Sequence, residues 1–586
     1  MKSRKVIVQE SSSARLMDQS RVRLMMIGFT FVLCFSAIGG RLLDVAVLQP
    51  ARAQTYAISN ADDDAVEQVQ VSEEAAHHKR RDVVDRRGEL LATSLRTASV
   101  FANPKEIRSP ELVAAQLAPV LAMDKNLLMI RLKSNKSFVW LKRNLTPREQ
   151  AATNRLGIPG LYFLPEERRV YPYGQLVSHA VGYVGVDNKG LAGIEKQFDQ
   201  QLRRSSQPEE PLALSLDMRV QAIVREEMQA YVERFHAIGA IGVVMEIKTG
   251  ELLAMVSLPD FDPHKPSRAS DTQKFNRVAL GTYEMGSTFK TFTMAMGLEY
   301  GVVDMRGGYD ATNPFRVATF AISDTHPKKR WLSVPEIFAY SSNIGTAKMA
   351  LEVGGKRQRE FLEKLGMMKP VEIELPEKAS PQVPEQWRDI STVTISYGHG
   401  ISVTPLHLAR GIAALVGDGT LPRLTLLRDD KNGASHQERI VSEETSQNIR
   451  RLMRLAVDHG TGSKADVPGY RVGGKTGTAE KINASGAYNE DAKIASFIAV
   501  FPSDAPKYLV LVMIDEPKGD KSTYGYATGG WIAAPVAGNV ISRMGMLYGI
   551  SPRYDVPQDD AEKYWTQRDE KTKPAAPKAV IHAATY

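Results

Sequence analysis

The sequence predicts an α+β protein that has one N-terminal transmembrane helix and an antiparallel sheet flanked by helices. Residues 24–43 are almost entirely apolar, and about 20 residues suffice for a helix to cross a bilayer. Strand-like runs at 241–247 and 251–257 precede a long helical region, and further runs follow at 494–501 and 508–514. An order of strands, helices and strands is typical of an α+β domain.

The N-terminal segment is predicted to stay attached as a membrane anchor. An Ala51-Arg52-Ala53 cleavage-like pattern lies past the apolar run and beyond the charges of Arg41 and Asp44, where cleavage is not expected. Basic residues outnumber acidic ones before the run, which places the N-terminus in the cytoplasm; they are Lys2, Arg4, Lys5, Arg15, Arg21 and Arg23. We therefore expect a cytoplasmic tail at 1–23, a single-pass anchor at 24–46, and a periplasmic or external remainder.

Composition excludes several classes of function. The net charge is +8, but half of that excess lies in the first 23 residues, so the body of the chain gives no electrostatic case for nucleic-acid binding. Cys34 is the single cysteine, which rules out an intramolecular disulfide. No His/Cys cluster has the spacing of a metal site, and we expect neither a metal nor a cofactor.

The rest of the chain divides into polar stretches and segments with helix or strand patterns. Residues 50–75 form a polar stalk, and 76–215 mix short helical and strand-like pieces. An amphipathic helix is expected at 220–235, followed by a hairpin that turns at Lys248-Thr249-Gly250. Helix formers run from Ser287 to Tyr300 behind Gly286, and the polar stretch beyond about 555 is predicted to be disordered.

Ser287-Thr288-Phe289-Lys290 is the chain's only S-x-x-K sequence. Residues three apart on a helix share a face, so the hydroxyl and the amine can meet. A helix start also offers free N–H groups and a dipole that favours negative charge. A lysine becomes a base only when its pKa is lowered, by a dry site or by a neighbouring cation. The pattern therefore indicates an activated serine nucleophile.

Two further motifs follow the serine in order. They are Ser341-Ser342-Asn343 and Lys475-Thr476-Gly477-Thr478, and Gly473-Gly474 before the second leave room for a substrate backbone. Each motif also has a second copy. Ser446-Gln447-Asn448 lies in a charged helical run and is predicted to be on the surface, while Lys248-Thr249-Gly250 precedes the serine and is read as a turn. The ordered triple predicts one cleft.

One sequence pattern suggests a different function, nucleotide binding. Residues 469–476 match G-x-x-x-x-G-K-[ST], and the apolar run at 509–514 ends in Asp515-Glu516. A phosphate-binding loop needs a strand before it and a long helix after it. Pro468 disfavours a strand before the loop, and a helix after it is disfavoured by Asn483, Ser485 and Gly486. The segment is also expected on the side of the membrane that lacks ATP.

With these three motifs, the sequence resembles the penicillin-binding protein and serine β-lactamase superfamily. Residues 78–88, 169–172 and 190–195 look like the pedestal motifs of class B penicillin-binding proteins, with Arg81 in place of a usual glycine. Met285 stands where a proline is common, and 397–400 and 404–406 resemble segments that border the active site. The resemblance covers about 76–550. It implies a pedestal (dimerisation) domain at 47–220, a transpeptidase domain at 221–552 with the penicillin-binding fold, and a tail at 553–586.

The resemblance also implies roles for individual residues. Ser287 would attack the penultimate D-Ala carbonyl of a stem peptide, Lys290 would act as base, and Ser341 would relay a proton near Lys475. Asn343 would bind the substrate amide and help to place Lys290. The substrate carboxylate would bind at the 475–478 strand, and backbone N–H groups would form the oxyanion hole; the residues of that strand are Lys475, Thr476, Gly477 and Thr478.

The implied partners are stem peptides ending in D-Ala-D-Ala, β-lactam inhibitors, a SEDS-family glycan polymerase and other division proteins in the bacterial inner membrane. The segment 283–291 and the short spacing of the pedestal motifs favour the division-specific members. An elongation-specific transpeptidase is the main alternative. A β-lactamase, a carboxypeptidase or a catalytically inactive penicillin sensor would share the fold.

Overall fold

The computed structural model describes residues 25–26, 31–33, 35–36, 80–203, 210–428, 438–482, 487–554 and 565. The chain divides into two compact units, 1–75 and 76–586. Short helical pieces at 25–26, 31–33 and 35–36 are all that is described of the predicted anchor, and no helix among the described residues has the length and apolar character to cross a membrane. The predicted cytoplasmic tail and stalk lie outside the described residues, as does most of the C-terminal tail.

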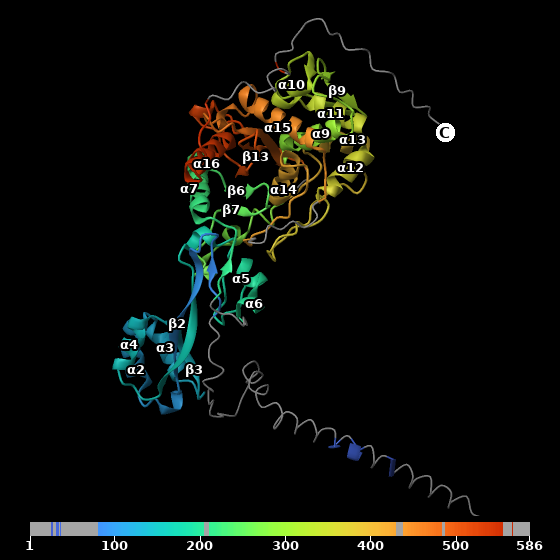
Figure 1. The fold of residues 1–586 in the computed structure, drawn as a ribbon. Helices are drawn as coiled ribbons and strands as arrows, with labels where there is room; N and C mark the ends of the chain where they lie inside the picture. The colour runs from blue at the N-terminus through green and yellow to red at the C-terminus, as the bar shows by residue number, and fades with distance from the viewer. Residues whose placement is uncertain are drawn as a thin grey trace, which may run out of the picture. The chain divides into compact units, whose positions relative to one another are not determined.

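The pedestal is built around one long strand (Figure 1). β2 (Leu90–Ala102) pairs antiparallel with β1 (Val83–Val84), β3 (Val139–Leu145) and β4 (Leu161–Val170), and β1 pairs parallel with β5 (Leu212–Ala213). Side chains of β2 and β3 pack with the neighbouring helices in a separate apolar core. These helices are α2 (Pro110–Leu121), α3 (Lys125–Leu132) and α4 (Pro147–Arg155).

The three pedestal motifs meet at one buried carboxylate. Arg80 Nε donates to Glu195 Oε2 at 2.6 Å, and Arg169 Nε donates to Glu195 Oε1 at 2.7 Å. All three side chains are at most 1% exposed, and Arg80 also reaches Asp199 at 2.7 Å. Glu195 lies in α5 (Gly193–Gln197) and Asp199 begins α6 (Asp199–Arg203). Buried charges need this kind of pairing to remain ionised.

Arg81 stands where the resemblance led us to expect a glycine. Its backbone does not adopt a left-handed conformation, so the turn does not require a glycine here. Its side chain donates from Nε to the Glu210 carbonyl at 2.6 Å. The substitution is therefore accommodated locally.

Asp85 and Arg86 join the pedestal to the C-terminal domain. Asp85 Oδ2 accepts the N–H of Met218 at 3.2 Å, at the start of α7 (Met218–Arg234). The Arg86 guanidinium lies 3.4 Å from the carboxylate of Glu251, which precedes β7 (Leu252–Leu258). The end of the first pedestal motif therefore contacts both a helix and the hairpin of the next domain.

The C-terminal domain has a five-stranded antiparallel sheet in the order β12-β13-β14-β6-β7. The strands are β12 (Gly473–Ile482), β13 (Tyr488–Phe501), β14 (Tyr508–Asp515), β6 (Gly239–Glu246) and β7. The predicted strands and the hairpin turn at Lys248-Thr249-Gly250 are confirmed. β13 begins at Tyr488, earlier than the apolar run at 494–501 indicated, because its first residues are polar.

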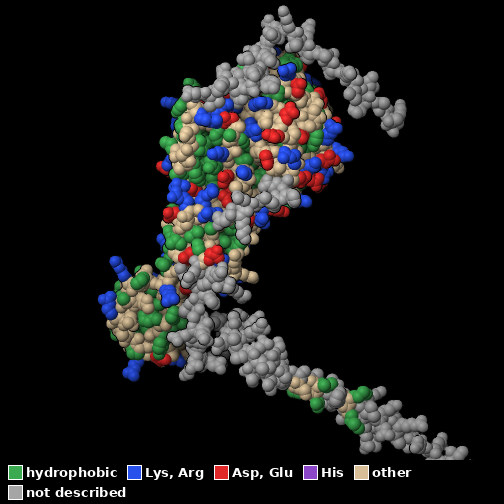
Figure 2. Space-filling model, in the orientation of Figure 1, with side chains coloured by type: hydrophobic (Ala, Val, Ile, Leu, Met, Phe, Trp, Pro, Cys, Tyr) green, Lys and Arg blue, Asp and Glu red, His purple; other side chains and the backbone are tan. Residues whose placement is uncertain are grey.

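Helices cover both faces of this sheet (Figure 1). α7 and α16 (Ala533–Leu547) pack together on one face, in an apolar core with β13 and β14. The other face is covered by α9 (Lys290–Glu299), α14 (Pro405–Val416) and α15 (Glu443–Asp458). The visible surface mixes acidic and basic side chains (Figure 2), as expected for a body with little net charge.

Smaller elements surround the end of the sheet near β12. The helices are η6 (Gly286–Phe289), α10 (Val334–Ala339), α11 (Asn343–Val353), α12 (Gly355–Lys364) and α13 (Asp389–Ser396). The short strands are β8 (Gly308–Asp310), β9 (Phe315–Val317), β10 (Phe320–Ile322) and β11 (Trp331–Ser333). Of these elements, η6, α10, α11 and α13 carry or adjoin residues that face β12 across a cavity, and they form its helical wall.

Two local expectations need correction. Ser287 lies in the short 3₁₀ turn η6, and the α-helix itself begins only at Lys290. Ser446 and Asn448 were predicted on the surface, yet both are buried, because this face of α15 turns toward the core with Ile449 and Leu452. Trp565, the one residue described beyond 554, stacks on His459 with 4.7 Å between ring centroids.

Replacing Glu195 with alanine should destabilise the pedestal strongly, because two buried guanidinium groups would lose their shared partner. Removing one member of a buried ionic cluster typically costs about 3–5 kcal/mol. Urea denaturation of the full chain in detergent measures the effect. Glu111→Ala, which breaks an exposed pair with Lys133, serves as the control and should leave the midpoint unchanged; equal midpoints for the two variants would contradict the prediction.

Candidate active site

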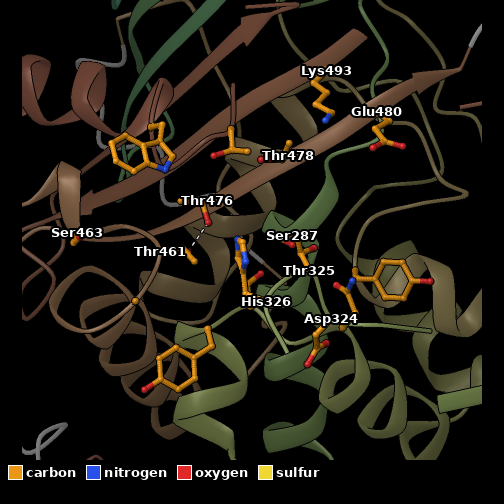
Figure 3. Close-up of a pocket in the computed structure, with 18 of the residues that line it drawn as sticks. Ser287, Asp324, Thr325, His326, Thr461, Ser463, Thr476, Thr478, Glu480 and Lys493 are labelled. Carbon is orange, nitrogen blue, oxygen red and sulfur yellow. Dashed lines mark hydrogen bonds between the residues drawn. The ribbon is translucent and has the colours of Figure 1, made fainter. Parts of the chain in front are cut away.

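A cavity of about 560 Å³ lies between β12 and the helical wall (Figure 3). The structure brings the three sequence motifs together there, although they are far apart in the chain. Residues from all three line the cavity, while Lys290 and Lys475 lie fully buried beside it. The lining residues from the motifs are Ser287, Ser341, Asn343, Thr476 and Thr478.

The turn that carries Ser287 depends on two glycines. Gly286 has φ +53°, and its N–H donates to the Gly398 carbonyl at 3.1 Å. A Cβ on Gly286 would come within 2.6 Å of the Thr478 carbonyl oxygen, and a Cβ on Gly398 would collide with the Gly286 backbone. Because neither position has room for a side chain, η6 can lie directly against β12, which places Ser287 beside the backbone of Thr478.

Lys290 is held by three hydrogen bonds from its Nζ. They reach Ser341 O at 2.5 Å, Ser341 Oγ at 3.0 Å and Asn343 Oδ1 at 2.7 Å. Burial lowers the pKa of Lys290 well below its usual value, and the charge of Lys475 lowers this pKa further, against an opposing effect of Asp324. The neutral amine, the form that can accept a proton, is therefore reached more easily here than by a lysine in water.

Ser341 is the shared partner of the two lysines. Its Oγ lies 3.0 Å from Lys290 Nζ and 3.0 Å from Lys475 Nζ. Its backbone has φ +61°, a left-handed conformation that costs a non-glycine residue about 1–2 kcal/mol. A hydroxyl that accepts two hydrogen bonds still has its own proton to donate. Ser341 is thus suited to pass a proton between a lysine and a group in the cavity.

Lys475 is anchored on β12 and is fully buried. Burial lowers the pKa of Lys475 to about 7. Its ammonium lies 5.6 Å from the centre of the Phe338 ring, a cation–π contact. The two lysines are therefore unlike: Lys290 is pushed toward the neutral form by burial and by a neighbouring charge, whereas Lys475 is shifted by burial alone.

Two residues that position the site were missed in the sequence. Asp324 Oδ2 accepts from Ser342 Oγ at 2.8 Å, and Asp324 Oδ1 accepts from the Ile344 N–H at 3.0 Å, so it fixes the start of α11. Thr461 Oγ1 lies 2.6 Å from Thr476 Oγ1. Asp324 belongs to no motif and gave no signal. Gly460-Thr461-Gly462, which follows α15 directly, was a signal that could have been read.

The segment 397–400 borders the cavity, as the resemblance implied. Tyr397 and His399 both line it. Burial lowers the pKa of His399, against the opposing charge of Glu284. The Glu284 carboxylate accepts from the Gly400 N–H at 2.7 Å and from the Tyr488 hydroxyl at 3.2 Å. This edge of the cavity is therefore held together by hydrogen bonds to one carboxylate.

The nucleotide-binding alternative finds no support in this geometry. Lys475 lies inside β12, which continues as a strand to Ile482. A phosphate-binding loop would instead lead into a helix. Asp515, the acidic residue after the second apolar run, pairs with Lys481 at 3.0 Å. Among the residues that the structure describes, no group of three or more His, Cys, Asp or Glu could hold a metal ion.

Comparisons with known proteins agree with this arrangement. Residues 240–542 match the family model for the penicillin-binding protein transpeptidase domain, and residues 76–208 match the penicillin-binding protein dimerisation domain. The chain is 37% identical over 557 residues to a probable peptidoglycan D,D-transpeptidase FtsI of Caulobacter vibrioides, covering 93% of this chain and 92% of that one.

More distant relatives share most of the length. A probable peptidoglycan D,D-transpeptidase PenA of Neisseria gonorrhoeae is 32% identical, over 81% of this chain and 85% of that one. The peptidoglycan D,D-transpeptidase FtsI of Escherichia coli K12 is 30% identical, over 80% and 84%. The crystal structure of a peptidoglycan synthetase from Bifidobacterium adolescentis shares the fold, with a TM-score of 0.64, 22% identity, and coverage of 82% of this chain and 97% of that one.

Acylation of the protein by a penicillin should slow as the pH falls, because protonation of Lys290 removes the base. Replacing Lys475 with methionine removes a charge that lowers the Lys290 pKa. This pKa should then rise, and the fall in rate should begin at a higher pH. The check is the acylation rate measured from about pH 5 to 10. Lys481→Met, outside the cavity, should leave the pH profile in place; identical profiles for all three proteins would refute this account.

Proposed function

The chain belongs to the penicillin-binding protein family of peptidoglycan D,D-transpeptidases, and we propose that Ser287 is the nucleophile with which it cross-links stem peptides. One observation carries the assignment. The Lys290 and Lys475 amines share hydrogen bonds to Ser341 Oγ, in a cavity that Ser287 lines. A hydroxyl, a base with a lowered pKa and a proton relay are the groups that acyl transfer through a serine requires.

Acylation would proceed in two steps. Ser287 Oγ attacks the carbonyl carbon of the penultimate D-Ala as neutral Lys290 accepts its proton. The oxyanion then lies between the N–H groups of Ser287 and Thr478, where each donor is worth about 3–4 kcal/mol in comparable sites. As the tetrahedral intermediate collapses, Ser341 passes a proton to the amine of the terminal D-Ala, which leaves. An amine of a second stem peptide then attacks the acyl carbonyl carbon and gives a proton to Lys290; the new amide forms as the C–O bond to Ser287 breaks, and Ser287 Oγ takes that proton back.

The same cavity supplies groups for binding the donor peptide. Lys475, Thr476 and Thr478 can hold the terminal carboxylate, since a fixed cation and hydroxyls suit it. Asn343 directs Oδ1 to Lys290 and one Nδ2 hydrogen to the Ser323 carbonyl at 3.0 Å. Its second Nδ2 hydrogen is left for a substrate amide. Gly477 acts by lacking a side chain, because a Cβ there would lie 2.8 Å from the Met285 carbonyl oxygen.

The finer features of this role are also proposals. We propose that residues 24–46 anchor the chain in the inner membrane, with the catalytic domain in the periplasm. The relatives named FtsI favour a role in septal wall synthesis, in contact with a SEDS-family glycan polymerase. The complete hydrogen-bond network around both lysines speaks against an inactive sensor. The dimerisation domain and the names of the relatives favour a transpeptidase over a β-lactamase.

Replacing Ser287 with alanine should abolish covalent labelling by a fluorescent penicillin, because it removes the hydroxyl that we propose forms the acyl-enzyme. Gel fluorescence of the purified full chain is the measurement. Ser446→Ala is the matched control, since this serine belongs to the second S-x-N sequence and is buried in α15 away from the cavity. Labelling that persists in the Ser287 variant would reject the assignment.

Depleting the protein from its host should produce filamentous cells if it acts at the septum, because elongation would continue without division. Phase-contrast microscopy after depletion is sufficient. Cells that swell and become round would instead assign the protein to elongation. Complementation with the wild-type chain, but not with the Ser287→Ala chain, would tie the phenotype to catalysis.

A further inference from the structure

Two turns of the chain that carry site residues meet in the wall of the cavity. One turn follows α10 and carries Ser341, and the other follows α15 and carries Thr461. The Thr461 N–H donates to the Ala339 carbonyl at 3.2 Å, and a Cβ on Gly460 would come within 2.4 Å of the same carbonyl oxygen. Tyr340, Ser341, Gly460 and Thr461 all line the cavity. The place where the two turns abut is therefore part of the site.

A tryptophan from the C-terminal segment bridges these two turns. The Trp565 ring stacks on His459 with 4.7 Å between ring centroids and 12° between the ring planes, and it meets the Tyr340 ring edge-on at 5.6 Å. Tyr340 directly precedes Ser341, and His459 lies two residues before Thr461. Trp565 therefore contacts both turns at once, next to the residues that they place in the cavity.

Trp565 itself does not enter the cavity. None of the described residues that line the cavity lies beyond Trp531 in the chain. The Lys328 ammonium lies 4.3 Å from the centre of the Tyr340 ring, so this ring is held by a cation as well as by the indole. The position of Trp565 therefore suits support of the cavity wall and not obstruction of a substrate.

The turn at Ser341 needs support from its surroundings. Its φ of +61° is a left-handed conformation that a residue other than glycine keeps only where its neighbours hold it. Ser341 Oγ also lies 3.0 Å from both Lys290 Nζ and Lys475 Nζ. In the other turn, Thr461 Oγ1 lies 2.6 Å from Thr476 Oγ1 (Figure 3). A small shift of either turn would alter the distances on which proton transfer and binding depend.

We infer that Trp565 is a positioning residue for the acylation of Ser287. By packing against Tyr340 and His459 together, the indole holds the two turns against each other, so that Ser341 keeps its hydrogen bonds to both lysines. The inference rests on the proposed function, because that function gives Ser341 its place in proton transfer. The C-terminal segment thereby takes part in the reaction, although Trp565 lies outside the cavity.

Replacing Trp565 with alanine should slow acylation without unfolding the domain. The full chain in detergent is mixed with a saturating concentration of fluorescent penicillin, and the first-order rate constant of labelling is measured by rapid quenching. This rate constant should fall about three- to tenfold, a range that matches the loss of aromatic pair contacts. The midpoint of urea unfolding should stay at the wild-type value.

Two further variants show whether the ring contact is the cause. Trp565→Phe keeps a ring that can pack on the same partners, and it should retain roughly half or more of the wild-type rate. Tyr554→Ala is the matched control, since this aromatic side chain closer to the domain is 73% exposed. It should be acylated at the wild-type rate.

The contact with His459 can be checked by a signal that does not depend on the rate. Incorporated 5-fluorotryptophan gives one ¹⁹F resonance for each of the five tryptophans, and the resonance that is missing from Trp565→Phe belongs to Trp565. His459→Ala should move this resonance toward the position of free fluorotryptophan. The same variant should slow acylation, and adding Trp565→Ala to it should slow it by less than about twofold more, because both changes remove one contact.

Several results would overturn this role of Trp565. They are a Trp565→Ala chain that is acylated at the wild-type rate, a Trp565→Phe chain as slow as the alanine variant, and losses that multiply in the double variant. A slower rate that comes with a lower unfolding midpoint would show a structural role only, and would equally reject it. The proposed function fails separately, if the Ser287→Ala chain is still labelled.

Discussion

The proposed catalytic arrangement depends on two buried lysine amines that share one serine hydroxyl. Lys290 and Lys475 are both fully buried, and each lies 3.0 Å from Ser341 Oγ. Two ammonium groups this close would repel strongly in a medium of low dielectric constant, so the pair favours losing a proton. Lys290 loses it more readily, because burial and the charge of Lys475 act on its pKa together. The geometry of the site itself thus lowers the pKa of the proposed base.

The pedestal also buries two cations side by side, but it gives them a shared carboxylate. In the pedestal, Glu195 accepts a hydrogen bond from Arg80 with one oxygen and from Arg169 with the other. Among the described residues, no carboxylate contacts Lys290 or Lys475, and Asp324, the acidic residue that opposes the fall in the Lys290 pKa, accepts from Ser342 and Ile344. The buried arginines therefore have a charged partner, whereas the hydrogen bonds of the two buried lysines go to uncharged oxygens, so that burial lowers the pKa of both lysines.

The motifs and the sheet could be predicted from the sequence, because each is visible in a short stretch of residues. The strands of the C-terminal domain show as apolar runs, and Ser287, Ser341 and Lys475 show as ordered motifs. Asp324 could not be found in this way, since it belongs to no motif and acts through contacts with Ser342 and Ile344. Thr461 stands between two glycines and could have been found from that local pattern. Ser446 was misplaced because a charged helical run was read as exposed all round, whereas an amphipathic helix buries one face. The 3₁₀ turn at Ser287 follows from the packing of Gly286 against Thr478, and no local pattern encodes it.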